Sequence, residues 1–110
     1  MGTYNELTTG VDVIEIDRIE RVVARWGNRF LERIYTPEEL TYCKGKFNRL
    51  AARFAAKEAV MKALGTGTRG VGWKEVEVTR KPSGAPTILL HGRALRRASA
   101  IGIQSLAVSL

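Results

Sequence analysis

Residues 48–64 read NRLAARFAAKEAVMKAL, and this stretch predicts the longest helix of the chain. It is rich in alanine and other good helix formers, it contains neither glycine nor proline, and Gly65 follows it directly. Glycine is common just past the end of a helix because it adopts the left-handed conformation without strain. We therefore predict a central helix over 48–64 that ends at Gly65.

The residues after this helix predict a hairpin and a further helix. A glycine-rich loop leads into an alternating strand over 73–79. The segment PSGAP at 82–86 has the residues that turns prefer, and a second strand over 87–91 follows it. These two strands form an antiparallel hairpin in our prediction. The chain then continues with a helix over 92–100 and a last strand over 103–110.

The residues before the central helix predict a strand and two more helices. Residues 7–16 are rich in Thr, Val and Ile, as strands are, although Gly10 and Asp12 interrupt them. Asp17 fits the N-cap of a helix, and the motif TPEE at 36–39 matches the capping box that starts another. The apolar residues that recur at helical spacing after Asp17 are Ile19, Val22, Val23, Trp26 and Phe30.

Length and composition indicate one α+β domain, in which a mainly antiparallel sheet packs on the long central helix. A chain of 110 residues suits one domain, 1–110, and the order of elements suits this class. No apolar run long enough to cross a membrane and no secretory signal is present, so we expect a soluble, cytoplasmic protein. Cys43 is the only cysteine, which excludes an internal disulfide. The net charge of +7 favours an acidic or phosphorylated partner.

Two acidic residues lie where the pattern calls for apolar ones. Glu58 comes four residues after Phe54, on the helix stripe that should face the core. Asp12 shares the predicted strand face with Ile14. Together the two carboxylates can hold a hard cation such as magnesium. The simpler alternative for Glu58 is an i,i+4 ion pair with Lys62, which stabilises an exposed helix by about 0.2–0.5 kcal/mol.

Positive charge and glycine lie next to Glu58. Lys57 and Lys62 flank it, and the loop GTGTRGVG at 65–72 follows, so ammonium groups and backbone N–H groups can converge on phosphate. The loop matches neither the Walker phosphate loop nor the dinucleotide fingerprint. A plain helix-to-strand connection with Gly65 as the helix cap is the alternative.

Arginines form a stripe on the helix predicted after Asp17 and continue beyond it. Such a stripe can dock an acidic helix, although a solvated helix face is the commoner meaning. His91 fits a surface residue at the end of a strand, because no nucleophile is placed beside it by spacing. The stripe consists of Arg18, Arg21, Arg25, Arg29 and Arg33.

The chain contains the motifs GVDVIEIDRI at 10–19 and RFAAKEA at 53–59. These two motifs resemble the signatures of the holo-acyl-carrier-protein synthases, which belong to the 4'-phosphopantetheinyl transferase superfamily. The resemblance covers nearly the whole chain, because further segments follow the order and spacing of that family. These segments are 30–36 with Glu39, 62–67, 73–78 and 84–86.

The resemblance implies the 4'-phosphopantetheinyl transferase fold and a magnesium-dependent enzyme. Such enzymes transfer 4'-phosphopantetheine from coenzyme A to a serine of apo acyl carrier protein, release adenosine 3',5'-bisphosphate, and serve fatty acid biosynthesis. The family pattern places the magnesium ligands at Asp12 and Glu58 and makes Lys62 catalytic at the leaving side. It also implies a homotrimer whose active sites lie at subunit boundaries.

The family pattern also assigns binding residues. Coenzyme A contacts fall on the central helix, the glycine loop and, from an adjacent subunit, the hairpin turn: Arg53, Lys57, Lys62, Gly65, Thr66, Gly67, Ser83, Gly84 and Pro86. Carrier-protein contacts fall on the arginine stripe and its neighbours: Arg18, Val22, Arg25, Arg29, Phe30 and Arg33.

The chain departs from the family pattern at its end. Family members continue with a Ser-His motif and a further strand, whereas this sequence stops at Leu110. We expect the natural chain to continue beyond that residue. Two other functions compete with the transferase: a basic nucleic-acid-binding module, which lacks aromatic residues between its basic ones, and a non-catalytic family member. We expect neither a nucleic acid nor a membrane as partner.

Overall fold

The computed structural model describes residues 10–67 and 69–103 of the chain, and for residues 10–12 it describes the backbone alone. This part of the chain is an α+β structure with a two-stranded antiparallel sheet, as predicted. Its elements are α1 (Gly10–Trp26), α2 (Asn28–Ile34), α3 (Pro37–Cys43), α4 (Phe47–Leu64), the 3₁₀ helix η1 (Trp73–Glu75), β2 (Val76–Arg80), β3 (Pro86–Leu90) and α5 (Gly92–Ala100).

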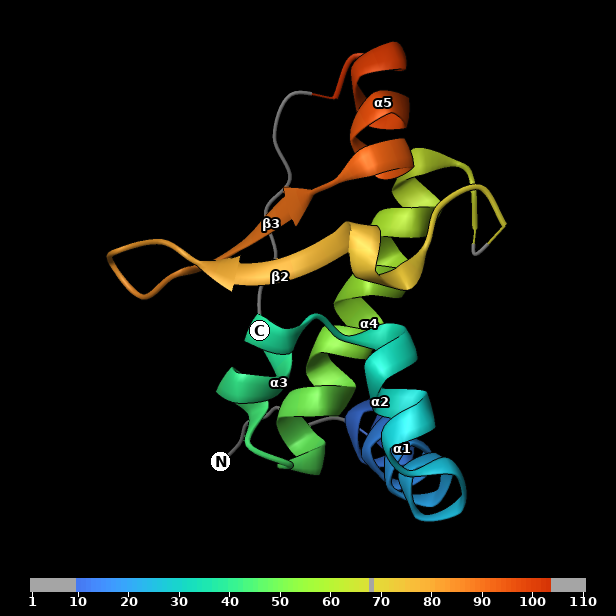
Figure 1. The fold of residues 1–110 in the computed structure, drawn as a ribbon, viewed down its shortest axis with the longest axis vertical. Helices are drawn as coiled ribbons and strands as arrows, with labels where there is room; N and C mark the ends of the chain where they lie inside the picture. Colours follow the sequence, from blue (N-terminus) through green and yellow to red (C-terminus); the bar gives the residue numbers. More distant parts are fainter. Residues whose placement is uncertain (1–9, 68, 104–110) are drawn as a thin grey trace.

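Helix α4 runs through the middle of the molecule (Figure 1). Helices α1, α2 and α3 gather around its first half, and the hairpin and α5 lie along its second half. The prediction for 48–64 is confirmed with one more residue at the start, Phe47. Gly65 ends the helix in the left-handed conformation, with φ 75°, and its N–H donates to the carbonyl of Lys62. The predicted helix 92–100 is confirmed as α5.

The core consists of two clusters that α4 connects. The helical cluster holds Ile19, Ile34, Tyr35, Cys43, Leu50, Ala51 and Phe54. The hairpin cluster holds Val60, Met61, Leu64, Val71, Val76, Ala94 and Ala98. Trp73 of η1 packs against both clusters, and its ring stacks on Phe54 with centroids 4.7 Å apart. Cys43 is a buried thiol whose pKa is raised by burial.

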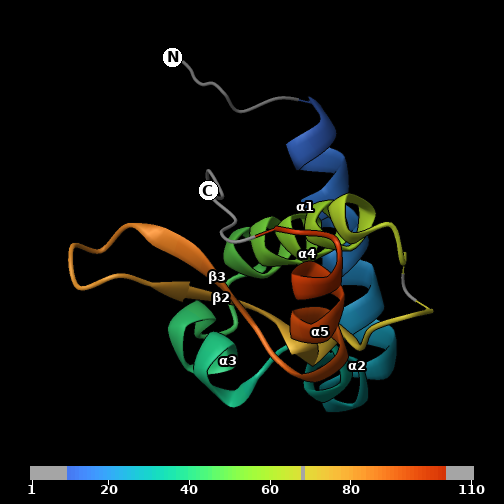
Figure 2. The ribbon, with the colours of Figure 1, turned by 90° about the horizontal axis from the view of Figure 1, so that it is seen from above.

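The hairpin pairs β2 with β3 from Val76↔Leu90 to Arg80↔Pro86, which confirms the predicted hairpin. Its turn extends away from the helices (Figures 1 and 2), and Gly84 there has a φ of 92°. The prediction of a strand from residue 73 is wrong for the first three residues, which form η1. The carboxylate of Glu75 accepts the N–H of Gly72 at 3.2 Å, and this local bond turns the chain before the strand begins.

The prediction of a strand over 7–16 is wrong for residues 10–16, because α1 begins at Gly10. Asp17 therefore lies inside a helix and is not its N-cap. Ile19 is buried in the helical cluster, and Ile16 and Val23 pack against that cluster. Their spacing is that of one helix face, so burial against α4 outweighs the β-propensity of Val and Ile. Residues 7–9 lie outside the described part.

Helix α3 begins as predicted. Thr36 is its N-cap, its hydroxyl accepts the N–H of Glu39 at 3.1 Å, and Glu39 Oε1 accepts the N–H of Thr36 at 2.8 Å. The capping box is confirmed, but Glu39 is 1% exposed and makes further bonds in the interior. The predicted strand 103–110 is not tested, because residues 104–110 lie outside the described part.

Glu75 also fastens η1 to the start of α5. Besides Gly72, its carboxylate accepts the N–H of Ala94 and of Arg93 Nε, each at 3.3 Å. Partial burial raises the pKa of Glu75, but the bonds from Gly72 and Arg93 outweigh it and hold the pKa below the ordinary 4.5. The unfolded chain therefore takes up this proton more readily than the folded one. The stabilisation is present above about pH 4.5 and is lost as the pH falls through the folded pKa.

We expect Glu75→Gln to lower the melting temperature at neutral pH, and the gap to the wild type to shrink as the solution is acidified. Thermal unfolding followed by circular dichroism across a pH series measures this gap. Glu38→Gln is the matched control, because Glu38 is exposed on α3. A gap of constant size down to about pH 3 would show that the carboxylate charge contributes nothing.

Candidate functional site

Lys57 and Glu58 follow each other on α4 but meet different surroundings. Lys57 is fully buried, whereas Glu58 is half-buried at the edge of the stripe that packs on the core. Our sequence prediction placed Glu58 on that stripe, and the structure places it at the border. Within the described residues, no hydrogen bond or ion pair joins Glu58 to Lys62, whose side chain is exposed. Among the described side chains, the carboxylate of Glu58 therefore has no partner that would compete with a ligand.

The proposed partner of Glu58, Asp12, lies on α1, and α1 packs against α4. The side chain of Asp12 lies outside what the structure describes, so the predicted metal pair stays a prediction. Among the described side chains, no group of three His, Cys, Asp or Glu residues is placed to hold a metal ion. A cation at Glu58 would therefore need Asp12, water or a ligand to complete its shell.

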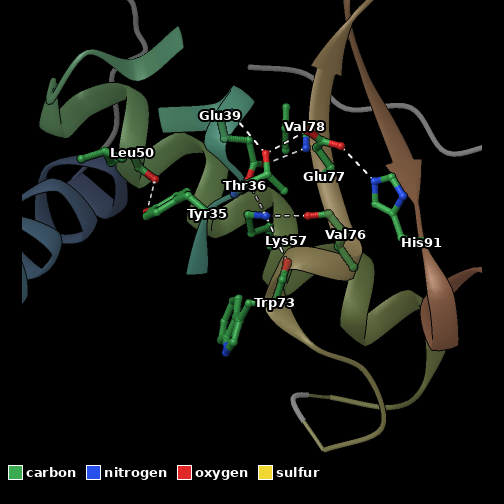
Figure 3. A network of polar contacts seen from close by, with 10 residues as sticks. All are labelled: Tyr35, Thr36, Glu39, Leu50, Lys57, Trp73, Val76, Glu77, Val78 and His91. Carbon is green, nitrogen blue, oxygen red and sulfur yellow. Dashed lines mark hydrogen bonds and ion pairs between the residues drawn. The ribbon is translucent and has the colours of Figure 1, made fainter. Parts of the chain in front are cut away.

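The ammonium of Lys57 is held inside the molecule (Figure 3). It forms an ion pair with Glu39 Oε1 at 2.8 Å and donates to the backbone carbonyls of Trp73 at 3.1 Å and Val76 at 2.5 Å. Burial lowers the pKa of Lys57, and the charge of Glu39 opposes that shift. The structure thus separates Lys57 from Lys62, which the sequence placed together as phosphate ligands.

Lys62 and the start of the glycine loop do lie together. Lys62 is in the last turn of α4, three residues before Gly65. Gly65 and Gly67 both have positive φ, of 75° and 57°, and the hydroxyl of Thr66 donates to the carbonyl of Gly67 at 3.2 Å. Arg97 of α5 donates to the carbonyl of Leu64 at 2.8 Å and so supports this end of α4. An exposed ammonium beside a tight glycine turn suits a phosphate ligand.

A second basic site surrounds the ring of Tyr42 on α3. The guanidinium carbons of Arg53, Arg80 and Arg49 lie 4.2, 4.4 and 5.0 Å from the ring centroid. Arg53 is 3% exposed, and its Nε is buried without a hydrogen-bond partner among the described residues. A buried guanidinium with an unused donor suits the binding of an anion.

The hairpin turn is joined to this arginine site within the same chain. Arg80 donates to the hydroxyl of Tyr42 and to the carbonyl of Gly84. Gly84, with Ser83 and Pro86 beside it, was predicted to reach a coenzyme A bound by another subunit. Sequence reasoning did not find Tyr42, Arg49 or Arg80. The i,i+4 spacing of Arg49 and Arg53 was the one signal that could have paired two of these arginines.

The arginines of the predicted docking surface are exposed on α1 and α2, and its apolar members are half-buried. The guanidinium of Arg18 lies 5.5 Å from the ring of Phe54 and 3.6 Å from the carboxylate of Glu15. Arg21 pairs with Asp17 at 3.0 Å. The members of this surface with exposed side chains are Arg18, Arg25, Arg29 and Arg33, and the half-buried ones are Val22 and Phe30.

Comparisons with known proteins agree on one family. The family model described as "4'-phosphopantetheinyl transferase superfamily" matches residues 8–109. The holo-[acyl-carrier-protein] synthase of Solibacter usitatus is 53% identical over 106 residues, which cover 93% of this chain and 85% of that one. That of Koribacter versatilis is 54% identical over 100 residues, which cover 87% of this chain and 80% of that one.

Solved structures give the same answer. The holo-[acyl-carrier-protein] synthase from Neisseria meningitidis aligns with a TM-score of 0.76 and 38% identity, over 86% of this chain and 78% of that one. The enzyme from Helicobacter pylori, solved in complex with coenzyme A, aligns with a TM-score of 0.73 and 36% identity, over 84% of this chain and 78% of that one. No helix among the described residues is both long and apolar enough to cross a membrane.

Proposed function

Because the chain belongs to the holo-[acyl-carrier-protein] synthases of the 4'-phosphopantetheinyl transferase superfamily, and is thus a transferase, we propose that it transfers 4'-phosphopantetheine from coenzyme A to a serine of apo acyl carrier protein. The reaction requires magnesium and releases adenosine 3',5'-bisphosphate in this proposal. One observation supports it most: α4 carries Glu58, a carboxylate with no ion pair among the described side chains, and in sequence Glu58 lies between two separate basic sites, at Arg53 and at Lys62.

The two basic sites match the chemistry of coenzyme A, which carries a diphosphate and a separate phosphate on its ribose. Arg53 and Lys62 are nine residues apart on α4, which is about 13 Å along the helix axis and half a turn around it, so the two side chains project from opposite sides of the helix. One phosphate cannot reach both, whereas two phosphate groups of coenzyme A can where the sites of two subunits meet at a boundary. We assign the diphosphate to Lys62 and the turn of Gly65, Thr66 and Gly67. We assign the ribose phosphate to Arg53 and to the hairpin turn that Arg80 joins to the same arginine site, at Ser83, Gly84 and Pro86.

Magnesium fits the residues that would hold it. Carboxylate oxygens are the protein ligands it prefers, Glu58 has no competing ion pair among the described side chains, and Asp12 lies on the helix packed against α4. When bound, the ion would supply positive charge against the charge that develops on the diphosphate.

The transfer proceeds by in-line displacement at phosphorus. The serine oxygen of the carrier forms a bond to the phosphorus that carries pantetheine, and the bond from that phosphorus to the bridging oxygen breaks. The electron pair leaves with adenosine 3',5'-bisphosphate, whose charge Lys62 stabilises. The serine proton passes to the carboxylate of Glu58 or to a water molecule.

The assignment is tested by incubating the protein with apo carrier protein, coenzyme A and magnesium, and weighing the carrier by mass spectrometry. We expect the carrier to gain the mass of one phosphopantetheine group, and the gain to disappear when a chelator removes the metal. A carrier of unchanged mass at high enzyme concentration would overturn the proposed activity. Transfer that continues in the chelator would overturn the magnesium requirement alone.

Arg53→Met should raise the KM for coenzyme A between about 10- and 100-fold, because a hydrogen bond between charged groups contributes about 1.5–3 kcal/mol. The same contact can be removed by changing the substrate, because 3'-dephospho-coenzyme A lacks the ribose phosphate. The variant should bind that substrate as well as the wild type does. Arg96→Met is the control, because Arg96 is exposed on α5. If Arg53→Met weakens both substrates equally, Arg53 does not bind the ribose phosphate.

The arginine-rich face of α1 and α2 is the docking surface for the carrier protein in this proposal, because acyl carrier proteins are acidic. Arg18→Glu should raise the KM for the carrier about tenfold at low ionic strength, and added salt should reduce the difference. The KM for coenzyme A should stay unchanged. Arg96→Glu controls for the change in net charge. An equal effect of both substitutions would argue against a local docking surface.

The quaternary structure and the cell compartment remain part of the proposal. The family resemblance supports a homotrimer with active sites at subunit boundaries, working in the cytoplasm for fatty acid biosynthesis. Exposed apolar side chains on β3 and on or just after α5 are available for such contacts: Leu89, Leu95 and Ile101.

A further inference from the structure

The side chain of Lys57 has no free donor for a substrate. An ammonium group carries three N–H bonds, and each has an acceptor: Glu39 Oε1, the carbonyl of Trp73 and the carbonyl of Val76. The side chain is fully buried. A phosphate would have to displace these acceptors and open the core, so the structure argues against a direct contact between Lys57 and coenzyme A.

Both carboxylate oxygens of Glu39 also have hydrogen-bond partners in the interior. Its Oε1 accepts the N–H of Thr36 as well as the ammonium of Lys57, and its Oε2 accepts the N–H of Val78 at 2.8 Å. The side chain is buried and both of its oxygens already accept hydrogen bonds, so Glu39 has no free acceptor for a substrate. Glu39 thus joins the start of α3 to α4 and β2 at one point.

The ion pair takes the place of a neighbouring strand along β2. The N–H of His91 donates to the carbonyl of Glu75, so by alternation the odd-numbered residues of β2 bond to β3. The carbonyl of Val76 and the N–H of Val78 then point to the opposite edge, where no strand is paired among the described residues. Lys57 and Glu39 take up these two groups (Figure 3), which satisfies buried backbone at an open edge.

The bonds at this edge also set the direction of Glu58. Successive helix residues are about 100° apart around the axis, so fixing Lys57 against β2 fixes the side from which Glu58 projects. The bond to the carbonyl of Trp73 adds a link to η1, which follows the glycine loop. A rotation or shift of α4 would change the position of Glu58 relative to Lys62 and the loop.

We infer that Lys57 and Glu39 are positioning residues for the transfer: together they hold α4 on the open edge of β2 so that Glu58 faces the reacting phosphate, and Lys57 does not touch coenzyme A. This inference rests on the proposed function. It predicts that two residues far apart in the sequence, 39 and 57, affect the same kinetic constant in the same way.

The test compares Lys57→Met, Glu39→Gln and the double variant in steady-state transfer. Each single variant should lower kcat between about 10- and 100-fold, because small misplacements of a catalytic group have effects of this size. The KM for coenzyme A should stay within about twofold. The double variant should be no worse than the singles, since it leaves no unpaired buried charge. Lys46→Met, an exposed lysine at the start of α4, should keep wild-type kinetics.

If Lys57 contacted coenzyme A directly, its substitution would change KM instead of kcat. Lys62→Met is the reference for such a direct contact. If Lys57→Met raises the KM for coenzyme A while Glu39→Gln leaves both constants unchanged, Lys57 binds the substrate and the inference is wrong. Hydrogen exchange at the Val78 amide provides a second readout, because that N–H should exchange faster in both single variants. If a single variant does not fold, the double variant carries the test.

The proposed function and the positioning role of Lys57 and Glu39 can be disproved separately. A wild-type protein that transfers nothing overturns the proposed function, and the exchange experiment then still reports whether the ion pair closes the strand edge. An active wild type whose single variants keep normal kcat overturns the positioning role and leaves the proposed function intact.

Discussion

Glu58→Gln should lower kcat for transfer about a thousandfold, with little change in melting temperature. The substitution keeps the size of the side chain and removes the negative charge. If Glu58 holds the cation and accepts the serine proton, its loss removes electrostatic stabilisation of about 4 kcal/mol at the transition state. The fold should not change, because Glu58 is half-buried and has no ion pair among the described side chains.

The experiment measures transfer by mass spectrometry and unfolding by circular dichroism on the same preparations. Glu38→Gln is the matched control, since it makes the same change at an exposed position of α3 and should keep full activity. A Glu58→Gln protein that transfers at more than a tenth of the wild-type rate would remove Glu58 from the catalytic site. A large fall in melting temperature would instead assign it a structural role.

The elements that the sequence predicted correctly are those with local signals. The central helix, its glycine cap, the capping box at Thr36 and the hairpin each depend on residues close together in the chain. The segment over residues 10–16 lacks such a signal. Its Val and Ile content favours a strand, and only the position of α4 shows that Ile16 and Ile19 lie on one helix face that packs on the core.

The candidate site shows the same limit. Lys57 and Glu58 each lie three or four residues from both Phe54 and Met61, so helical spacing cannot tell which one faces the interior. The choice is made by partners far away in the chain, Glu39 and the open edge of β2. The arginine site around Tyr42 depends on a contact with Arg80, 38 residues away, for which the sequence gives no sign.

Trp73 shows what the two-cluster core implies for stability. Its ring stacks on Phe54 in the helical cluster and also contacts the hairpin cluster, so it fills the space between them. The sequence placed Trp73 on a strand, where alternation would have given it one face only. In η1 it instead serves both clusters, and its carbonyl accepts a bond from Lys57.

Trp73→Ala should therefore lower the free energy of unfolding by about 3 kcal/mol, at the lower end for a large aromatic because the ring is only half-buried. About 1 kcal/mol of this loss should depend on the stacked ring of Phe54. A double-mutant cycle with Phe54→Leu isolates that part. Urea unfolding followed by circular dichroism measures both values. Trp26→Ala is the control. Because Trp26 is 49% exposed, this substitution should lower the free energy of unfolding far less.

The number of transitions in the unfolding curve tests whether the two clusters unfold together. Helix α4 runs through both clusters, so the Trp73→Ala protein should still unfold in one transition. Two separate transitions would mean that Trp73, rather than α4, makes the clusters cooperative. Equal costs for Trp73→Ala and Trp26→Ala would contradict the bridging role. Because Glu58 lies on α4 between the clusters, a cooperative core is what keeps the proposed catalytic carboxylate in one place relative to both basic sites.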